Sequence, residues 1–348
     1  MEETEHKRRV RYKGKYPRHF NEKYKELDPE KYAGTVEHVI EKGSTPAGMH
    51  IPIMVKEILE FFDLRPGMNG FDATLGYGGH SLQILKKLDH QGKLYASDVD
   101  PIEIEKTRER LKKQGYTEQD FSARLMNFSK IDELAGEIGQ FDFILADLGV
   151  SSMQIDNPER GFTYKADGPL DLRMNPTIGS SAAELLTNLS ETELETILIC
   201  NSDEPYAKEI AKTVFKTLRR GKTIATTGEL FQAVASTFDS KKLGKEEKNE
   251  LIKKSAARTF QALRIEVNHE YEVLSDFLNK LPEALADGGK VAILTFHSGE
   301  DRLVKQAFKE FYRQGLFTAV SDKVIRPSAE ECRKNSRAHS TKMRWAIK

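Results

Sequence analysis

A glycine-rich segment follows the first apolar strand expected in this chain. It has the sequence DATLGYGGHS at residues 72–81 and leads into a helix expected at 81–88. Small residues at such a turn let the backbone approach a ligand closely, and the N–H groups at the start of the helix can donate to it. The segment lacks the final glycine of a dinucleotide fingerprint and the Gly-Lys-Ser/Thr of a P-loop. A tight turn without a ligand is the alternative, so this segment alone is weak evidence of a binding site.

Two carboxylates stand where the next strands are expected to end. Asp98 follows the strand expected at 93–97, and Asp147 follows the apolar strand expected at 141–146. Ligands of open parallel sheets bind outside the carboxyl ends of the strands, so both side chains should face the glycine-rich segment. Asp98 can accept from both hydroxyls of a ribose, and Asp147 can hold an exocyclic amine or accept its proton during attack on a methyl sulfonium. With no assured seat for a pyrophosphate, the pattern favours S-adenosylmethionine over a nicotinamide dinucleotide. The alternatives are a solvated loop carboxylate at Asp98 and a helix cap at Asp147.

The order of elements that must position these residues is strand, helix, strand, helix. This order predicts a parallel sheet covered by helices on both faces. The next buried strand is expected only at 290–296, and the stretch before it is too long for a simple crossover. Within that stretch we expect an inserted, all-helical subdomain with helices at Ala182–Asn188, Glu191–Cys200, Tyr206–Arg219, Gly228–Phe238 and Glu246–Lys254. Ser190 with Glu193 fits a capping box, and Thr227 is expected to cap the fourth helix.

Composition excludes several classes of protein. The 348 residues are 38% apolar and 31% charged, and no apolar stretch reaches the roughly 18 residues that a membrane helix needs. The basic, polar N-terminus does not fit a secretory signal. Cys200 and Cys332 are too few for a disulfide framework or a four-cysteine zinc site, which favours the reducing cytoplasm. No His, Cys or carboxylate cluster has the spacing of metal ligands, so no metal-binding residues are predicted and metal dependence stays open.

The net charge of zero hides two basic ends. Residues 1–25 hold nine Lys/Arg against four Glu, and residues 323–348 hold eight against two. Both ends carry aromatic rings: Tyr12, Tyr16, Phe20, Tyr24 and Trp345. Cations beside stacking rings suit RNA-contacting arms. Solvated, partly disordered tails are the alternative.

Nine motifs in order from about residue 50 to the C-terminus resemble the bacterial ribosomal RNA small subunit methyltransferase H family. They are MHIPIM at 49–54, the 72–81 segment, DVDP at 98–101, DLGVSSMQ at 147–154, NPERGF at 157–162, DGPLDLRM at 167–174, RTFQALRI at 258–265, FHSGEDR at 296–302 and NSRAHSTK at 335–342. The resemblance implies S-adenosylmethionine-dependent methylation of N4 of a cytidine in the decoding centre of 16S ribosomal RNA. It also implies a Rossmann-like class I methyltransferase fold (α/β, with a parallel-rich sheet) and the small ribosomal subunit as partner.

The resemblance assigns roles to individual residues. Its cofactor contacts carry over to Gly78, Gly79, His80, Asp98, Phe128, Asp147 and Gln154. Asp147 is the expected proton acceptor, helped by His297, for which a structural hydrogen-bonding role is the alternative. Arg160, Arg173, Arg264 and Arg302 are candidate contacts to phosphate or base, with internal salt bridges as the alternative.

The same resemblance predicts the domain organisation. We expect a basic N-terminal extension at 1–48, a methyltransferase domain at 49–150 and 256–348, and an inserted helical substrate-recognition subdomain at 151–255. The extension is typical of a longer, second form of the enzyme found beside the ordinary one in some Gram-positive bacteria. Four positions depart from the family pattern: Met153 for Pro, Asn175 for Asp, Gly299 for Leu and Ser336 for Pro.

Two other functions stay open at this point. One is a methyltransferase that acts on another RNA, a DNA cytosine or a small molecule, and the other is a non-catalytic ribosome-assembly factor. The sequence also leaves the oligomeric state open, with a homodimer among the alternatives.

Overall fold

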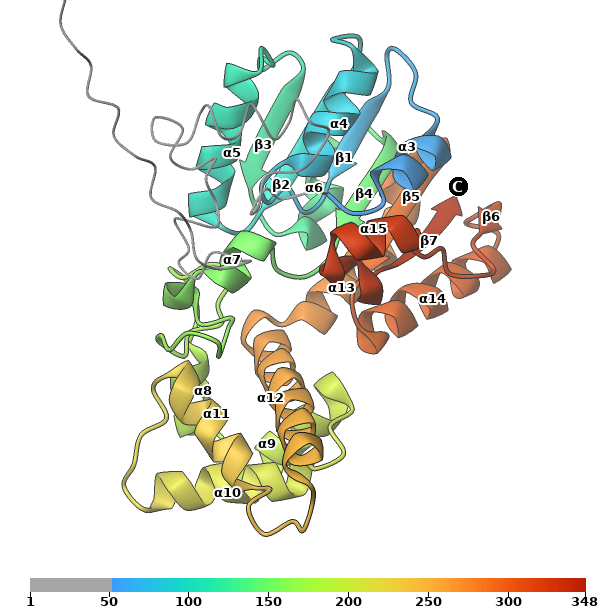
Figure 1. Ribbon diagram of the computed structural model, residues 1–348. Helices are drawn as coiled ribbons and strands as arrows, with labels where there is room; N and C mark the ends of the chain where they lie inside the picture. The colour runs from blue at the N-terminus through green and yellow to red at the C-terminus, as the bar shows by residue number, and fades with distance from the viewer. Residues whose placement is uncertain (1–51) are drawn as a thin grey trace, which may run out of the picture. The chain divides into compact units, whose positions relative to one another are not determined.

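A computed structural model describes residues 52–348, and the basic N-terminal extension expected at 1–48 lies outside the described residues. Its centre is a sheet of seven strands in the order β3-β2-β1-β4-β5-β7-β6 (Figure 1). The strands are β1 (Asn69–Asp72), β2 (Lys93–Asp98), β3 (Phe121–Leu125), β4 (Phe141–Asp147), β5 (Leu285–Thr295), β6 (Ala319–Val320) and β7 (Lys342–Ile347). Pairing is parallel from β3 through β5, and β7 is antiparallel to β5 and β6. The predicted α/β fold with a parallel-rich sheet is confirmed.

Helices cover both faces of the sheet, and β4 shows how its residues are shared between them. Phe143 and Leu145 belong to the apolar cluster on one face, whereas Ile144 and Ala146 belong to the cluster on the other. The first cluster is built with α3 (Val55–Phe62), α4 (Gly79–Leu88) and α5 (Pro101–Lys113). The second is built with α6 (Ile131–Ile138), α13 (Glu270–Ala284) and α14 (Ser298–Arg313). Burial on both faces explains the uninterrupted apolar run of β4.

A third apolar core belongs to the helices between β4 and β5. After α7 (Ser152–Asp156) come α8 (Ala182–Asn188), α9 (Glu191–Ser202), α10 (Ala207–Arg219), α11 (Thr227–Ser236) and α12 (Lys245–Asn268). The predicted all-helical insertion is therefore present (Figure 1). The capping box of Ser190 and Glu193 is confirmed, but the cap of α11 is Thr226, whose hydroxyl accepts from Glu229 N–H, and not Thr227.

The last helix of the insertion was predicted too short. We expected it to end at Lys254, but α12 continues to Asn268 because Ala256, Phe260 and Leu263 carry an apolar face into the third core. The predicted domain boundary between residues 255 and 256 thus falls inside one continuous helix. The domain limits themselves stay a prediction.

The basic C-terminal end, residues 323–348, was expected to be either an RNA-contacting arm or a partly disordered tail. Both expectations are wrong, because this segment is part of the folded domain. Residues 342–347 form β7, an inner strand of the sheet. The Trp345 ring packs on Phe61, with ring centroids 5.1 Å apart. Arg344 is 6% exposed and its Nε donates to Asp301 Oδ1 at 2.6 Å. Before it lie α15 (Ala329–Lys334) and a short 3₁₀ turn at Ser336–Ser340. In residues 52–348, no helix combines the length and apolar character needed to cross a bilayer.

Candidate active site

The glycine-rich segment is held between the ends of the two strands that flank β1. Gly76 N–H donates to Asp98 Oδ2 at the end of β2, at 2.7 Å. On the other side, Asp147 N–H at the end of β4 donates to Thr74 Oγ1, also at 2.7 Å. The strand ends and the segment that the sequence singled out therefore meet at one edge of the sheet, as parallel pairing of β2, β1 and β4 requires.

Gly78 lies in a left-handed conformation, with φ of 73°, directly before α4. A Cβ at this position would lie 2.6 Å from Thr107 Cγ2 of α5. Backbone geometry and packing on α5 therefore both require glycine here. The first turn of α4, with Gly79 and His80, follows directly, and its N–H groups have no partner within the helix.

Asp98 is fixed by two backbone donors. Its Oδ1 accepts from Asp100 N–H at 2.8 Å, and its Oδ2 accepts from Gly76 N–H. Burial raises the pKa of Asp98 to about 6, so the carboxylate is mostly ionised at neutral pH. Each oxygen has a further lone pair that can accept from a ribose hydroxyl.

Asp147 has one oxygen with a neighbour and one without. Its Oδ2 lies 3.5 Å from His80 Nδ1, whereas its Oδ1 is buried and makes no hydrogen bond to any residue in the described part of the chain. Burial raises the pKa of Asp147 to about 6. A buried carboxylate oxygen without a donor among the described residues is expected to accept a hydrogen bond from a bound ligand beside the glycine-rich segment.

His80 links α4 to Asp147. Its Nε2 lies 2.9 Å from the carbonyl oxygen of Ile53, and because a carbonyl only accepts, this nitrogen must carry the proton. In the neutral ring Nδ1 then presents a lone pair to Asp147. Two lone pairs facing each other would repel, so His80 Nδ1 and Asp147 Oδ2 attract each other only when one of the two atoms carries a proton.

Gln154 lies in α7 with both ends of its amide engaged. Its Nε2 donates to Asp100 Oδ2 at 2.9 Å, and its Oε1 accepts from Ser151 N–H at 2.8 Å. Asp100 is fully buried, caps α5 through Oδ1 and also accepts from Arg160 Nη1 at 2.7 Å. Sequence reasoning missed Asp100 as the residue that joins α5, α7 and Arg160, because it read the residue only as part of the DVDP turn.

Each of the four candidate arginines is paired inside the protein, as their alternative reading predicted. Besides Arg160, these are Arg173 with Asp171 at 2.7 Å, Arg264 with Glu270 at 2.7 Å and Arg302 with Asp203 at 3.2 Å. Arg264 binds Glu270 through Nε and Nη2, while its Nη1 would lie 3.9 Å from a Cβ placed on Gly149, next to Asp147.

Phe128 lies in a 3₁₀ turn, Phe128–Lys130, after β3. Its ring is partly buried and meets Phe277 of α13 edge-on, with centroids 5.0 Å apart. The backbone leading into this turn is joined to β2, since Met126 N–H donates to the carbonyl of Asp98 at 3.0 Å. The expected contact between Phe128 and an adenine stays a prediction.

His297 is the N-cap of α14. Its Nδ1 accepts from Glu300 N–H at 3.4 Å, and its Nε2 lies 3.1 Å from Glu300 Oε1 without hydrogen-bond alignment. Glu300 in turn accepts from Phe296 N–H at 2.9 Å. Burial opposes ionisation of Glu300, but His297 and Arg264 outweigh it and lower its pKa. These contacts give His297 a structural task, and its part in catalysis stays a prediction.

Glu270, His297 and Glu300 form a group that sequence spacing did not reveal. Their ligand atoms lie within 4.8 Å of one another, close enough to surround a metal ion. However, Arg264 already donates to both oxygens of Glu270, at 2.7 and 2.9 Å. A guanidinium supplies the positive charge of this group, so we assign it no metal.

The chain is similar to several curated proteins over its whole length. It is 60% identical to "Ribosomal RNA small subunit methyltransferase H 1" of Agathobacter rectalis, covering 100% of this chain and 99% of the relative. It is 54% identical to "Ribosomal RNA small subunit methyltransferase H 2" of Alkaliphilus metalliredigens, covering 99% of both. The protein named without a number from Caldicellulosiruptor saccharolyticus is 39% identical and covers 86% of this chain. The numbered relatives thus share the N-terminal extension, as the longer form predicts.

A solved structure of a putative methyltransferase from Streptococcus mutans, in complex with SAH, is more distant. It matches 85% of this chain and 98% of its own with a TM-score of 0.38 and 12% sequence identity. The MraW methylase family model matches residues 47–348, a range that contains all nine motifs described above. The chain therefore belongs to the MraW methylase family, a family of S-adenosylmethionine-dependent methyltransferases, as its motifs predicted.

Proposed function

We propose that this protein transfers the methyl group of S-adenosylmethionine to N4 of a cytidine in the decoding centre of 16S ribosomal RNA, as a cytoplasmic enzyme acting on the small ribosomal subunit. The observation that carries the proposal is the buried Oδ1 of Asp147, which makes no hydrogen bond to the residues that the structure describes and lies beside the glycine-rich segment and Asp98. The printed names of the relatives, which specify ribosomal RNA of the small subunit, support the choice of substrate.

The residues around the strand ends would hold the cofactor. Asp98 would accept from the ribose hydroxyls, because two backbone donors already orient its carboxylate. Backbone N–H groups of Gly79 and His80 would face the methionine part, with Gly78 allowing the close approach. Phe128 would pack on the adenine. Gln154 would act through Asp100 and Ser151 by fixing the loop after β4.

Cytosine N4 is a poor nucleophile because its lone pair is conjugated with the ring. The bound cofactor supplies an activated methyl group, and the protein must align N4 with it and accept a proton. Asp147 Oδ1 has no hydrogen-bond donor within residues 52–348, so it would accept a hydrogen bond from the N4 amino group. His80 Nδ1, 3.5 Å from the other oxygen, offers a second place for the proton. The cytidine must be unpaired or flipped to reach this position.

Asp147→Asn tests the role of this carboxylate, because the amide keeps the shape but cannot take the proton. We expect kcat for methyl transfer to small subunits to fall by about 10²–10⁴. S-adenosylmethionine affinity, measured by equilibrium dialysis, should change much less. Unchanged turnover would remove Asp147 from the mechanism, and loss of cofactor affinity alone would make it a binding residue.

The choice of substrate is tested by methyl incorporation into small subunits, deproteinised 16S ribosomal RNA and DNA. We expect incorporation into ribosomal RNA in one or both of its forms, and none into DNA. Incorporation into DNA alone would favour the alternative of a DNA methyltransferase. Cofactor binding without incorporation into any of the three would favour the assembly factor.

A further inference from the structure

One helix of the insertion, α10, exposes a row of cations. Lys208, Lys212 and Lys216 follow one another at intervals of four residues and are all exposed. Four residues of α-helix rise about 6 Å, so the three ammonium groups are spaced regularly along one side of the helix. None of the three forms an ion pair in the part of the chain that the structure describes, whereas Arg219 on the same helix pairs with Glu191 at 3.0 Å. We name these three residues the α10 row.

The opposite side of α10 explains why the row points to solvent. Ile210, Ala211 and Val214 are fully buried in the third core, and α10 packs mainly on α9 and α11. An amphipathic helix needs polar residues on its outer face, but it does not need them all to be basic. Glu209 is the one carboxylate that α10 carries on its surface. The outer face is therefore positive.

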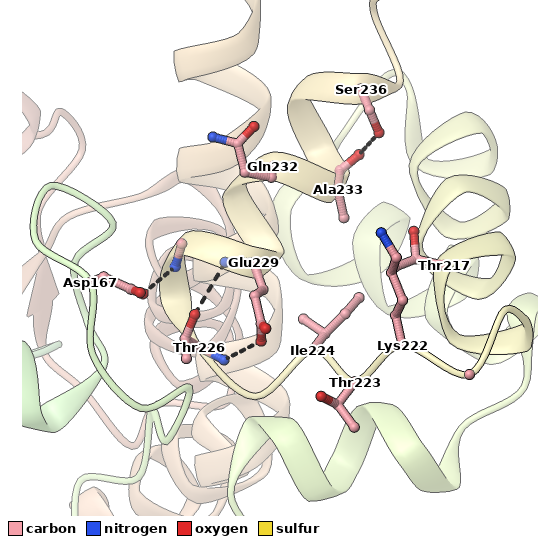
Figure 2. Close-up of a pocket in the computed structure, with 12 residues that line it drawn as sticks. Asp167, Thr217, Lys222, Thr223, Ile224, Thr226, Glu229, Gln232, Ala233 and Ser236 are labelled. Atoms are coloured by element: carbon pink, nitrogen blue, oxygen red, sulfur yellow. Dashed lines mark hydrogen bonds between the residues drawn. The ribbon is translucent and has the colours of Figure 1, made fainter.

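The positive charge continues past the end of the helix. Arg220 and Lys222 are exposed in the loop between α10 and α11, again without an ion pair among the described residues. Lys222 lines a surface depression of about 830 Å³ between this loop and α11. Figure 2 shows Lys222 and Thr217 on one side of the depression and Glu229 and Gln232 across from them.

The polar groups in this depression fall into two sets. Asp167 and Glu229 are turned onto the backbone, where they accept from Gly228 N–H at 2.8 Å and Ala225 N–H at 2.7 Å. The side chains of Lys222, Thr223 and Gln232 make no hydrogen bond to another described residue, so they are available to a ligand. The depression thus combines room for a nucleotide with donors and acceptors that can contact a sugar or base edge.

We propose that the α10 row, continued by Arg220 and Lys222, binds the phosphate backbone of the ribosomal RNA substrate, and that the depression beside Lys222 receives a nucleotide of the same strand. A row of unpaired cations fits a row of phosphates, and release of counterions supplies most of the affinity. The main neighbours of α10 are other helices of the insertion, so this surface would bind a part of the RNA that is distant from the methylated cytidine. The proposal rests on the proposed function, because it takes RNA as the substrate.

The test is a Lys208/Lys212/Lys216→Gln variant of the full chain. Glutamine keeps the helix propensity of lysine, and the positions are exposed, so folding should be unchanged. We expect the Kd for 16S ribosomal RNA to rise at least tenfold at about 0.1 M salt. The slope of log K against log salt should decrease by about 2, at roughly 0.7 per lost phosphate contact. S-adenosylmethionine affinity and kcat at saturating small subunits should stay within about twofold of wild type.

The matched control is Lys86/Lys87/Lys112→Gln. These lysines are also exposed and lie near the C-terminal ends of α4 and α5, at the edge of the sheet opposite the strand ends that form the site. The control removes the same charge and should keep the affinity and salt slope of wild type. If both variants lost the same affinity for RNA, the effect would come from net charge alone and the proposal would be overturned. It would also be overturned if the α10 variant bound RNA as tightly as wild type.

Two further readouts separate this proposal from its alternatives. If the α10 variant lost affinity for vesicles of phosphatidylglycerol but kept its affinity for RNA, the row would be a membrane contact and the proposal would fail. If wild-type protein bound 16S ribosomal RNA through the α10 row without methylating it, the proposed function would fail and the α10 proposal would stand.

Discussion

Asp98 and Asp147 both have carboxyl groups with a raised pKa, since burial raises the pKa of each to about 6. Both must be ionised to act as proposed, Asp98 as an acceptor for ribose hydroxyls and Asp147 as a proton acceptor. We expect kcat/KM for methyl transfer to be steady above pH 7 and to fall as pH decreases through about 6. The Asp147→Asn variant should lose activity but show a shallower acid limb in what remains. A wild-type profile that stays flat to pH 5 would contradict these roles.

The same burial predicts a change in stability. A carboxyl group with a raised pKa destabilises the folded state when it is ionised, and Asp147 Oδ1 has no hydrogen bond among the described residues. Asp147→Asn should therefore raise the free energy of unfolding of the cofactor-free protein at pH 7.5 by about 1–3 kcal/mol. The gain is complete well above pH 6, shrinks as pH falls through about 6, and is lost below about pH 4, where Asp147 is protonated in both the folded and the unfolded state. Urea unfolding at pH 7.5 and pH 4.5 measures it; equal or lower stability of the variant at pH 7.5 would contradict the unpaired charge.

At the scale of single residues, the sequence was informative where a side chain's position follows from a strand end. Asp98 and Asp147 could be placed that way. The partners of Arg160 and Arg264 could not, because a pairing such as Arg160 with Asp100 joins positions sixty residues apart and depends on how α7 packs against α5. The motif resemblance pointed to Gln154 but not to Asp100, which holds it.

Among the elements, α14 has a glycine, Gly299, as its second residue, where the family pattern has leucine. A Cβ on Gly299 would lie 1.9 Å from Tyr271 Oη, which donates to the carbonyl of Asn201 at 3.1 Å. This hydroxyl joins α13 to the end of α9, and Arg302 of α14 reaches Asp203 in the same region. Gly299 therefore makes room for a contact between the insertion and the helix that follows His297.

Gly299→Ala tests this contact. In an ordinary helix position the change would stabilise by about 0.5–1 kcal/mol, but displacement of Tyr271 should make it destabilising by about 1–3 kcal/mol. Combining it with Tyr271→Ala should remove the clash, so the double variant should be more stable than the sum of the single changes by about 1 kcal/mol or more. Urea unfolding of the four proteins gives the coupling. Additive effects, or stabilisation by Gly299→Ala, would show that Tyr271 does not occupy this space.

The strength of the sequence prediction also varied between elements. Strands buried on both faces and helices with clear caps were found near their true ends, because their patterns are local. The strand β7 was not, since its KMRWAI sequence reads as a basic tail until β5 pairs with it and Asp301 neutralises Arg344. Likewise α12 was cut short because its charged first half hides an apolar second half that only the packed insertion requires.

For the molecule as a whole, the basic extension gives a prediction that does not depend on the described structure. Residues 1–25 hold nine Lys/Arg, and the extension lies outside the described residues. Deletion of residues 1–45 should weaken binding of small subunits and lower its dependence on salt, by the same counterion argument as for the α10 row. Filter binding across a salt series measures both. Normal binding and methylation by the shortened protein would give the extension another task.

The organisation into a sheet domain with an insertion could be predicted from the sequence. The stretch between β4 and β5 is too long for a simple crossover, and its periodicity is helical. What the insertion does with its surface could not be read in the same way. The α10 row is visible in the sequence only as scattered lysines, and it becomes a row once α10 is known to bury Ile210 and Val214 on its other side.

The central claim is that this protein methylates N4 of a 16S ribosomal RNA cytidine with Asp147 at the reacting amine. Nucleoside mass spectrometry of 16S ribosomal RNA from cells with the gene, without it, and complemented by wild type or Asp147→Asn tests it most directly. We predict that N4 methylation at one cytidine disappears without the gene, returns with wild type and does not return with Asp147→Asn. An unchanged level of N4-methylated cytidine in cells that lack the gene would contradict the claim.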